Sequence, residues 1–334
     1  MFKKIILFTT AFTFVVVVVG AFVRLTDAGL GCPDWPGCYG KPTPAHAASD
    51  IAKAVVAQGG THGPVSIQKA WHEMLHRYLA GALGLLILGV AVAAWVKRKR
   101  LEQSPWLASV LLLLVIFQAA LGMWTVTMLL KPVIVTLHLL GGMATLALLT
   151  WLAMRQVRVA PPIVSIAGAP PLRPWALLGL ALLVAQIALG GWVSTNYAAL
   201  ACIDLPTCQG AWIPKMDFQH GFQLLRELGH TAAGDKLRYD ALTAIHWTHR
   251  VGAVVVTGYL AWLSWRVSRV SGLRVIALVI GVLLVAQVSL GAGNILTGLK
   301  LAVAVAHNAG AALLLMALVV LNFALSPMSH RPES

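Results

Sequence analysis

Residues 118–141 read QAALGMWTVTMLLKPVIVTLHLLG, and residues 287–310 read QVSLGAGNILTGLKLAVAVAHNAG. Each stretch has two apolar segments joined at a lysine. At an offset of 169, four residues recur: Gln118, Gly122, Lys131 and His138 align with Gln287, Gly291, Lys300 and His307. Apolar composition alone does not produce a glutamine, a lysine and a histidine at the same spacing. The chain therefore contains an internal repeat of apolar helices that carry histidine.

The repeat continues toward the start of each half. At an offset of 170, Gly20, Val23, Cys32, Cys38 and Gly40 align with Gly190, Val193, Cys202, Cys208 and Gly210. The pair His76-Arg77 aligns with His249-Arg250 at an offset of 173, so the intervening loops differ by only a few residues. These matches indicate that a four-helix unit was duplicated.

The composition is that of a polytopic membrane protein. The chain has 334 residues, of which 59% are hydrophobic and 11% charged, and its mean hydropathy is +0.81. Such values exclude an ordinary soluble domain. The net charge of +14 lies in the breaks between apolar runs, so it indicates membrane orientation rather than nucleic-acid binding.

Apolar runs long enough to cross a bilayer predict an all-α integral membrane protein with eight transmembrane helices in two pseudo-symmetric four-helix bundles. The runs are 5–23, 72–96, 106–129, 133–154, 174–194, 244–265, 273–296 and 302–325. The first resembles a signal peptide, but no small-residue cleavage site follows it, so we expect a retained anchor. Residues 1–158 form the first half, the proline-rich stretch 159–173 the cytoplasmic linker, and residues 174–334 the second half.

The short basic segments all fall on one side if eight helices alternate. They are Lys3 with Lys4, residues 97–100, Arg155 with Arg158 and Arg173, and Arg266 with Arg269 and Arg274. This pattern predicts a bacterial cytoplasmic (inner) membrane protein with both termini in the cytoplasm and the loops 24–71 and 195–243 on the periplasmic or extracellular side.

The two outer loops hold all four cysteines. In an oxidising compartment they fit two disulfides, Cys32–Cys38 and Cys202–Cys208, rather than free thiols. Exposed disulfides that close short loops are reducible, so a redox-active pair stays open.

Four of the eleven histidines lie inside apolar runs, two in each half: His76, His138, His249 and His307. An ionisable side chain within a span indicates function. The spans carry no thiolate and no third or fourth histidine per site, and glycines follow each histidine. This set favours axial ligation of haem iron by side chains on facing helices. All four lie one to two turns from the outer ends of their helices, which argues against electron transfer across the membrane.

For the remaining histidines, their positions in the sequence predict simpler roles. His72 and His246 lie at the outer mouths of their helices, where we expect interfacial or hydrogen-bonding roles. His46, His62, His220, His230 and His330 lie in loops or the tail, where we expect solvated surface positions.

Cations lie close to the predicted ligands. Lys131 and Lys300 each precede a histidine by seven residues, which on a helix is the same face about 10 Å away. Arg77 and Arg250 directly follow theirs. All four are candidates for haem propionates, and interfacial snorkelling is the alternative.

The two halves differ in the residue three positions before the first histidine of each pair. The first reads Glu73-Met-Leu-His76-Arg77, and the second reads His246-Trp-Thr-His249-Arg250. A carboxylate beside one haem alone could act as a base or stabilise a developing cation there. A glutamate at the water boundary that pairs with Arg77 is the alternative. The asymmetry predicts a reaction site in the first half and an electron-transfer or structural haem in the second.

The run GAFVRLTDAGLGCPDWPGC at 20–38, followed by EMLHR at 73–77, resembles the haem A synthase family of cytochrome oxidase assembly. The resemblance covers essentially the whole chain. It implies an oxidoreductase that converts the C8 methyl of haem O to the formyl of haem A by successive hydroxylations, with water as the oxygen source. It implies Glu73 as the catalytic carboxylate, His76 and His138 as ligands of haem O or haem A, and His249 and His307 as ligands of haem b.

The implied partners are the lipid bilayer, a haem O synthase (farnesyltransferase) as upstream donor, cytochrome c oxidase or its assembly factors, and an electron acceptor that the sequence does not identify. Homo-oligomerisation stays open, and no nucleic acid is expected. Two other functions use the same histidines: a dihaem cytochrome b and a haem carrier or chaperone. Extracted pigments distinguish them, because only the synthase predicts haem O and haem A beside haem b.

Overall fold

The computed structural model describes residues 2–60, 62–101, 104–157 and 172–326. Within these ranges it is all-helical, as predicted, with isolated bridges in place of any strand. The helices are α1 (Phe2–Leu25), α2 (Ala48–Ala57), α3 (Ile67–Val96), α4 (Trp106–Thr127), α5 (Pro132–Gln156), α6 (Leu172–Thr195), α7 (Phe218–Gly221), α8 (Tyr239–Ser268), α9 (Arg274–Leu296) and α10 (Leu301–Ala324). The linker predicted at 159–173 lies outside the described residues except for its last two positions, which begin α6.

Seven of these helices are long and apolar enough to cross a membrane: α1, α3, α4, α5, α6, α9 and α10. The long helix α8 falls outside this group because polar residues, among them His246, His249 and Arg250, occupy its first half. The chain is therefore a helical membrane protein with seven candidate spans among the described residues.

Two helices begin earlier than the apolar runs predict. α3 starts at Ile67 instead of 72, where the Ser66 hydroxyl accepts a hydrogen bond from the Lys69 amide at 3.1 Å. A side-chain cap of this kind satisfies an amide that the helix itself leaves free. α8 likewise starts at Tyr239 instead of 244. Polar first turns extend both helices beyond their apolar segments.

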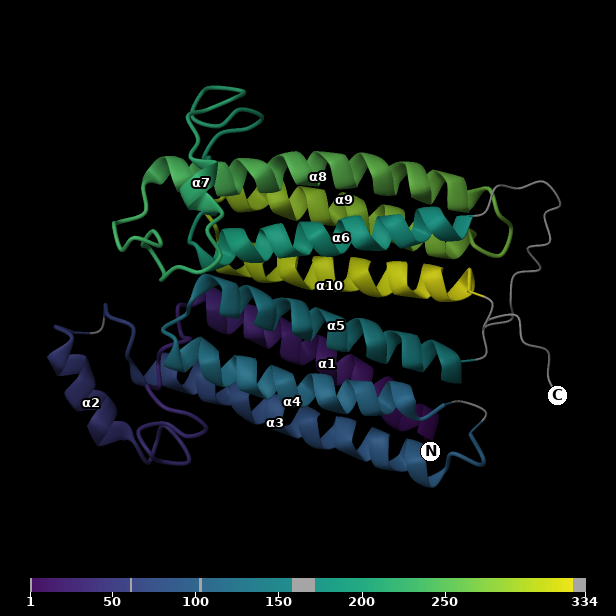
Figure 1. Ribbon diagram of the computed structural model, residues 1–334, viewed down its shortest axis with the longest axis horizontal. Helices are drawn as coiled ribbons and strands as arrows, with labels where there is room; N and C mark the ends of the chain where they lie inside the picture. The colour runs from purple at the N-terminus through teal and green to yellow at the C-terminus, as the bar shows by residue number, and fades with distance from the viewer. Residues whose placement is uncertain (1, 61, 102–103, 158–171, 327–334) are drawn as a thin grey trace.

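The long helices pack as two groups of four (Figure 1). In the first group α1 contacts α3 and α5, α3 contacts α4, and α4 contacts α5. The second group repeats this pattern with α6, α8, α9 and α10. Between the groups, α5 contacts α6 and α10, and α1 contacts α10. Each group has its own apolar core, and the second core includes Met143 and Leu146 from α5.

Residues at equivalent places of the repeat touch where α1 and α6 end. Arg24 Nη2 donates to the carbonyl oxygen of Ser194 at 2.5 Å, and the Tyr197 hydroxyl donates to Asp27 Oδ1 at 2.8 Å. Both pairs are separated by 170 residues, which is the repeat offset. The Arg24 guanidinium also lies 4.1 Å from the centre of the Tyr197 ring. Residues one repeat apart in the sequence therefore contact each other at this end of α1 and α6.

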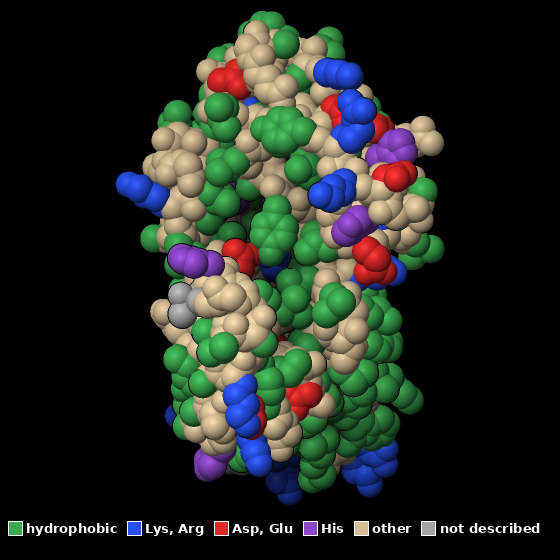
Figure 2. Space-filling model, turned by 90° about the vertical axis from the view of Figure 1, so that its left-hand side faces the viewer, with side chains coloured by type: hydrophobic (Ala, Val, Ile, Leu, Met, Phe, Trp, Pro, Cys, Tyr) green, Lys and Arg blue, Asp and Glu red, His purple; other side chains and the backbone are tan. Residues whose placement is uncertain are grey.

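The two ends of the molecule differ in character (Figure 1). The cysteine loops, with α2 and α7, lie at one end, and the start of α1 and the end of α10 lie at the other. Figure 2 looks onto the loop end, where acidic, basic and histidine side chains alternate with apolar ones. The sequence did not predict α2, which covers the first disulfide loop and buries Ile51 against Cys32 and Cys38.

Candidate functional site

The predicted histidine ligands of the first half face one another. His76 on α3 and His138 on α5 have ring centres 6.5 Å apart and perpendicular planes. Two metal–imidazole bonds of about 2 Å each, with roughly 1 Å from each ring centre to its nitrogen, would nearly fill this distance. Nδ1 of both rings is buried without a hydrogen-bond partner in the described structure. The pair therefore fits two axial ligands of one iron.

Each of the four intramembrane histidines rests against a glycine of the neighbouring helix. A Cβ built on that glycine would approach the histidine Cε1 to 2.9 Å at Gly20, 3.4 Å at Gly122, 3.1 Å at Gly190 and 3.1 Å at Gly291. The contacts join Gly20 to His76, Gly122 to His138, Gly190 to His249 and Gly291 to His307. A larger residue would push the ring, because real carbon contacts are about 3.5–4.0 Å.

This glycine set was missed as a site feature, although the repeat contains it. The sequence pointed instead to the glycines that follow each histidine on its own helix. Of those, Gly81 and Gly84 have no heavy atom within 4 Å of a built Cβ, so they do not mediate close helix packing.

The second half repeats the glycine contacts of the first. His249 on α8 and His307 on α10 occupy the places of His76 and His138, each against its glycine. His249 Nδ1 also lies 3.0 Å from Gln186 Nε2. Within the described residues, no group of three or more His, Cys, Asp or Glu side chains is placed to hold a metal ion. Two-histidine pairs fit haem, whose porphyrin supplies the other ligands.

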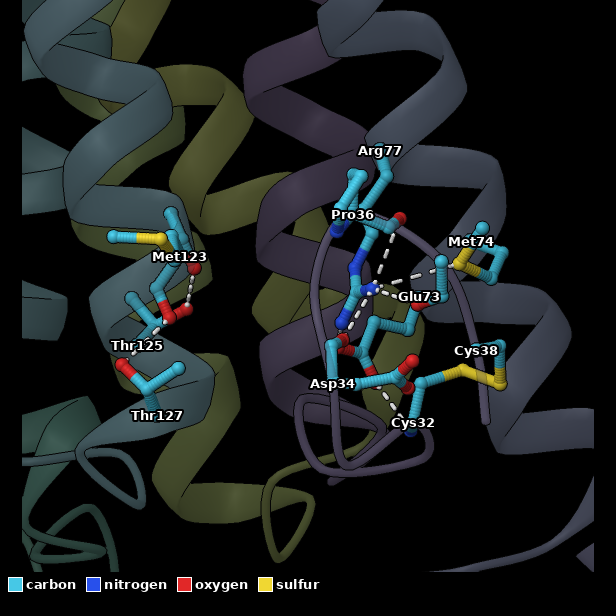
Figure 3. A network of polar contacts seen from close by, with 12 residues as sticks. Cys32, Asp34, Pro36, Cys38, Glu73, Met74, Arg77, Met123, Thr125 and Thr127 are labelled. Atoms are coloured by element: carbon cyan, nitrogen blue, oxygen red, sulfur yellow. Dashed lines mark hydrogen bonds and ion pairs between the residues drawn. A yellow bond between two sulfur atoms is a disulfide. The ribbon is translucent and has the colours of Figure 1, made fainter. Parts of the chain in front are cut away.

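Glu73, three residues before His76 on α3, is bonded to the first disulfide loop (Figure 3). Its carboxylate is buried, with 4% of the residue exposed. Oε2 accepts from the Cys32 amide at 3.0 Å, and Oε1 pairs with Arg77 Nη2 at 2.5 Å. Arg77 Nη1 in turn donates to the carbonyl oxygens of Asp34 at 2.8 Å and Gly37 at 2.5 Å. The predicted pairing of Glu73 with Arg77 is present, and the carboxylate lies in the interior rather than at an open water boundary.

The second half builds the same junction without a carboxylate. His246 Nδ1 accepts from the Cys202 amide at 3.2 Å and is 4% exposed. Arg250 Nη2 donates to the carbonyl oxygens of Asp204 at 2.9 Å and Pro206 at 3.2 Å. His246 therefore has the hydrogen-bonding role expected of it, and the two junctions differ chiefly in the charge at one position.

Three of the four cations predicted near propionates have other partners in the structure. Arg77 and Arg250 bind loop carbonyls, as described above. Lys131 forms an ion pair of 3.1 Å with Glu227, on the outer loop of the second half. Lys300 forms no ion pair among the described residues, and its backbone, like that of Lys131, caps the helix that carries the histidine. Of the four, Lys300 is the one whose side chain is least engaged.

Both predicted disulfides are confirmed: Cys32–Cys38 and Cys202–Cys208 are bonded, with Cα–Cα distances of 4.9 and 4.7 Å. An aspartate closes each loop. Asp204 accepts hydrogen bonds from the amides of Gln209 at 2.6 Å and Gly210 at 3.0 Å, and from the Thr207 hydroxyl at 2.5 Å. These bonds, that of Thr207 foremost, lower the pKa of Asp204 to about 2.

The other histidines contact residues outside the two histidine pairs or are exposed. His46 binds Thr43, His220 binds Asp217, His230 binds the Leu228 carbonyl, and His62 is exposed. His72 packs edge-on against Phe22 at 4.8 Å. His330 lies outside the described residues.

The described chain is a helical membrane protein in which repeat-related helices carry two histidine pairs. The chain belongs to the family described as cytochrome oxidase assembly proteins, whose model matches residues 3–319. It is 42% identical to the haem A synthase of Shewanella oneidensis over 319 residues, and this match covers 94% of each chain. It is also 29% identical to the haem A synthase of Halalkalibacterium halodurans, over 71% of this chain and 72% of that one. It is 28% identical to the haem A synthase of a Caulobacter species, over 90% of this chain and 89% of that one.

Proposed function

We propose that this chain is an oxidoreductase that converts haem O to haem A for cytochrome c oxidase. The relatives at up to 42% identity carry that name. Within the chain, the observation that carries the proposal is the buried Glu73 carboxylate beside one histidine pair, where the other pair has His246. A duplicated scaffold that differs by one carboxylate fits one reactive site and one redox site.

In this proposal His76 and His138 hold the substrate haem O and the product haem A, and His249 and His307 hold haem b. The facing rings and the buried Nδ1 atoms support the first assignment, and the glycines that leave room for each ring support both. Haem b would supply one-electron redox chemistry, accepting or relaying the electrons that the oxidation releases. Arg77, Lys131, Arg250 and Lys300 stay candidates for propionates, with Lys300 the best placed.

Glu73 would act on the methyl group that is oxidised. Each hydroxylation replaces a C–H bond with a C–O bond from water and releases two electrons and two protons. A second hydroxylation of the same carbon and loss of water leave the formyl group. A carboxylate in a poorly solvated position stabilises adjacent positive charge strongly and can accept a proton. The Cys32 amide and Arg77 hold Glu73 in one orientation for both tasks.

We also propose eight transmembrane helices in two pseudo-symmetric four-helix bundles, with α8 as the span beyond the seven apolar ones. α8 is 30 residues long and lies against α6 and α9 within its group. The first bundle covers residues 1–158 and the second 174–334. The basic helix ends lie opposite the disulfide loops, which supports a bacterial inner membrane location with cytoplasmic termini and periplasmic or extracellular loops.

The proposed partners follow from this chemistry. A haem O synthase would deliver a hydrophobic substrate through the bilayer, and cytochrome c oxidase or its assembly factors would take the product. A redox partner must remove the electrons.

A bacterial strain that makes haem O but no haem A tests the proposal. Expression of this chain should produce haem A in extracted pigments, and an empty vector should not. Haem b alone in the purified protein, with no haem A in the cells, would instead indicate a dihaem cytochrome. Weakly held, substoichiometric haem would indicate a carrier.

A further inference from the structure

Three of the four histidine helices share a two-part motif with the helix beside them. The neighbour has Gln-x3-Gly, and the histidine helix has His-x2-Gly. The sets are Gln118 and Gly122 with His138 and Gly141; Gln186 and Gly190 with His249 and Gly252; and Gln287 and Gly291 with His307 and Gly310. At the fourth helix, the corresponding residues are Val16 and Gly20 with His76 and Leu79. The glutamine and the second glycine are therefore replaced together.

The contacts explain why these two positions change together. A Cβ at Gly252 would collide with the Gln186 amide, and a Cβ at Gly310 would collide with the Gln287 amide. Gln118 lies against Gly141 in the same way. The glycine one turn after each of these histidines makes the space that the glutamine side chain occupies.

Among the three glutamines, Gln186 is the one whose amide reaches Nδ1 of its histidine in the described structure. Gln186 Nε2 lies 3.0 Å from His249 Nδ1 and 2.9 Å from the His249 carbonyl oxygen. Gln287 Nε2 lies 3.5 Å from His307 Nε2, and Nδ1 of His307 and of His138 is buried without a partner. Oε1 of both glutamines is buried with no hydrogen-bond partner in the described structure. An imidazole that binds metal through Nε2 carries its proton on Nδ1 and needs an acceptor there. The amide can present either its oxygen or its nitrogen, so it can supply that acceptor.

His76 has no such partner among the described residues. Val16 is 6% exposed and belongs to the apolar core of the first half, against which Leu79 packs. His76 Nδ1 is buried and unpaired. The amide that bonds to Nδ1 of His249, the repeat counterpart of His76, is replaced here by aliphatic side chains.

We propose that Gln186 is a positioning residue that orients and strengthens His249, and that Val16, at the equivalent place of the repeat, leaves His76 as the weaker ligand through which the first-half haem is released. This inference rests on the proposed function, because a product haem has to leave and a haem b has to stay. Outer hydrogen bonds to a ligating histidine fix its ring and raise its basicity, and their loss typically costs about 10-fold to 100-fold in affinity. His76 therefore opens first.

The test exchanges the motif between the halves. Purified protein with haem in both sites is mixed with an excess of a haem-free acceptor protein. The loss of haem O or A and the loss of haem b are then followed separately by pigment analysis. Val16→Gln with Leu79→Gly should slow the loss of first-half haem by about 10-fold or more. Gln186→Val should speed the loss of haem b by a similar factor.

A second readout separates positioning from packing. The amide acceptor favours ferric iron, so Gln186→Val should raise the midpoint potential of haem b; a tenfold change in relative ferric affinity is about 59 mV for one electron. Gln186→Glu keeps an acceptor oxygen and should not raise the potential. An equal rise in both variants would assign Gln186 a packing role only and overturn the inference.

The two proposals fail differently. If the unmodified chain forms no haem A in a strain that makes haem O, the proposed function is wrong. If haem A forms but Gln186→Val changes neither haem b loss nor its potential, the inference alone is wrong. Because Gln186→Val needs no rearrangement of the first-half core, it decides the matter even if the Val16→Gln, Leu79→Gly protein does not fold.

Discussion

The glycines that face the histidines give a graded prediction. A Cβ at Gly20 would lie 2.9 Å from His76 Cε1, about 0.6 Å inside the shortest favourable carbon contact of 3.5 Å. At Gly190 and Gly291 the shortfall is about 0.4 Å, and at Gly122 it is about 0.1 Å. Since ligand geometry tolerates about 0.5 Å, Gly20→Ala should displace His76 enough to weaken haem binding at the first site, whereas Gly122→Ala should be nearly neutral.

The magnitude follows from overpacking, which costs about 1–3 kcal/mol when a core cannot relax. At 1–2 kcal/mol, haem affinity at the first site should fall by a factor of about 5 to 30. Titration of haem-depleted protein with haem O, followed by the Soret absorbance, measures this. Gly81→Ala on α3 is the matched control, because it meets no atom within 4 Å and corrects for the general gain of alanine in a helix. If Gly20→Ala titrates like Gly81→Ala and Gly122→Ala, the glycine does not set the ring position and the reasoning is refuted.

Three further predictions concern the outer junction and the loops. Glu73→Gln keeps an acceptor for the Cys32 amide but removes the charge. Haem binding should therefore persist while haem A formation in the haem O strain falls by about 100-fold or more. Activity within a few-fold of the unmodified protein would rule out an ionised carboxylate in the reaction. Replacement of Cys32 and Cys38 together by Ser should remove about 2 kcal/mol of loop constraint and slow haem A formation, because Glu73 is no longer held by the loop. An unchanged rate of haem A formation would show that the loop does not hold Glu73. The folded-state pKa of Asp204, about 2, lies below the ordinary value near 3.9. Its stabilisation of the second loop is therefore present above about pH 4 and is lost as the pH falls through 2. Limited proteolysis should show the loop opening over that range, and Asp204→Asn should remove this pH dependence.

The sequence predicted the helices well because hydrophobic runs of this length have few alternatives in a membrane. The repeat also identified His76, His138, His249 and His307, and the structure places them in two equivalent settings. Their roles as ligands stay predictions.

Other features depended on contacts that spacing does not reveal. Hydropathy could not predict that Glu73 would lie under the first disulfide loop, because Cys32 is 41 residues away along the chain. Gln186 has no repeat partner, since Val16 stands at the matching place, so the repeat passed over it. The buried Arg226, which pairs with Asn196 and faces the Trp192 ring at 5.7 Å, belongs to the loop 195–243, where no motif or repeat match marks it.

Pigment analysis of single-site variants tests the central claim most directly: two histidine pairs, one for the haem that is oxidised and one for haem b. The measurement is the haem composition of His76→Ala and His249→Ala purified from cells that make both haem O and haem b. His249→Ala should lose haem b and keep haem O or haem A, and His76→Ala should keep haem b and lose the others. Haem b in both sites of the unmodified protein, or the same haem composition in both variants, would contradict the claim.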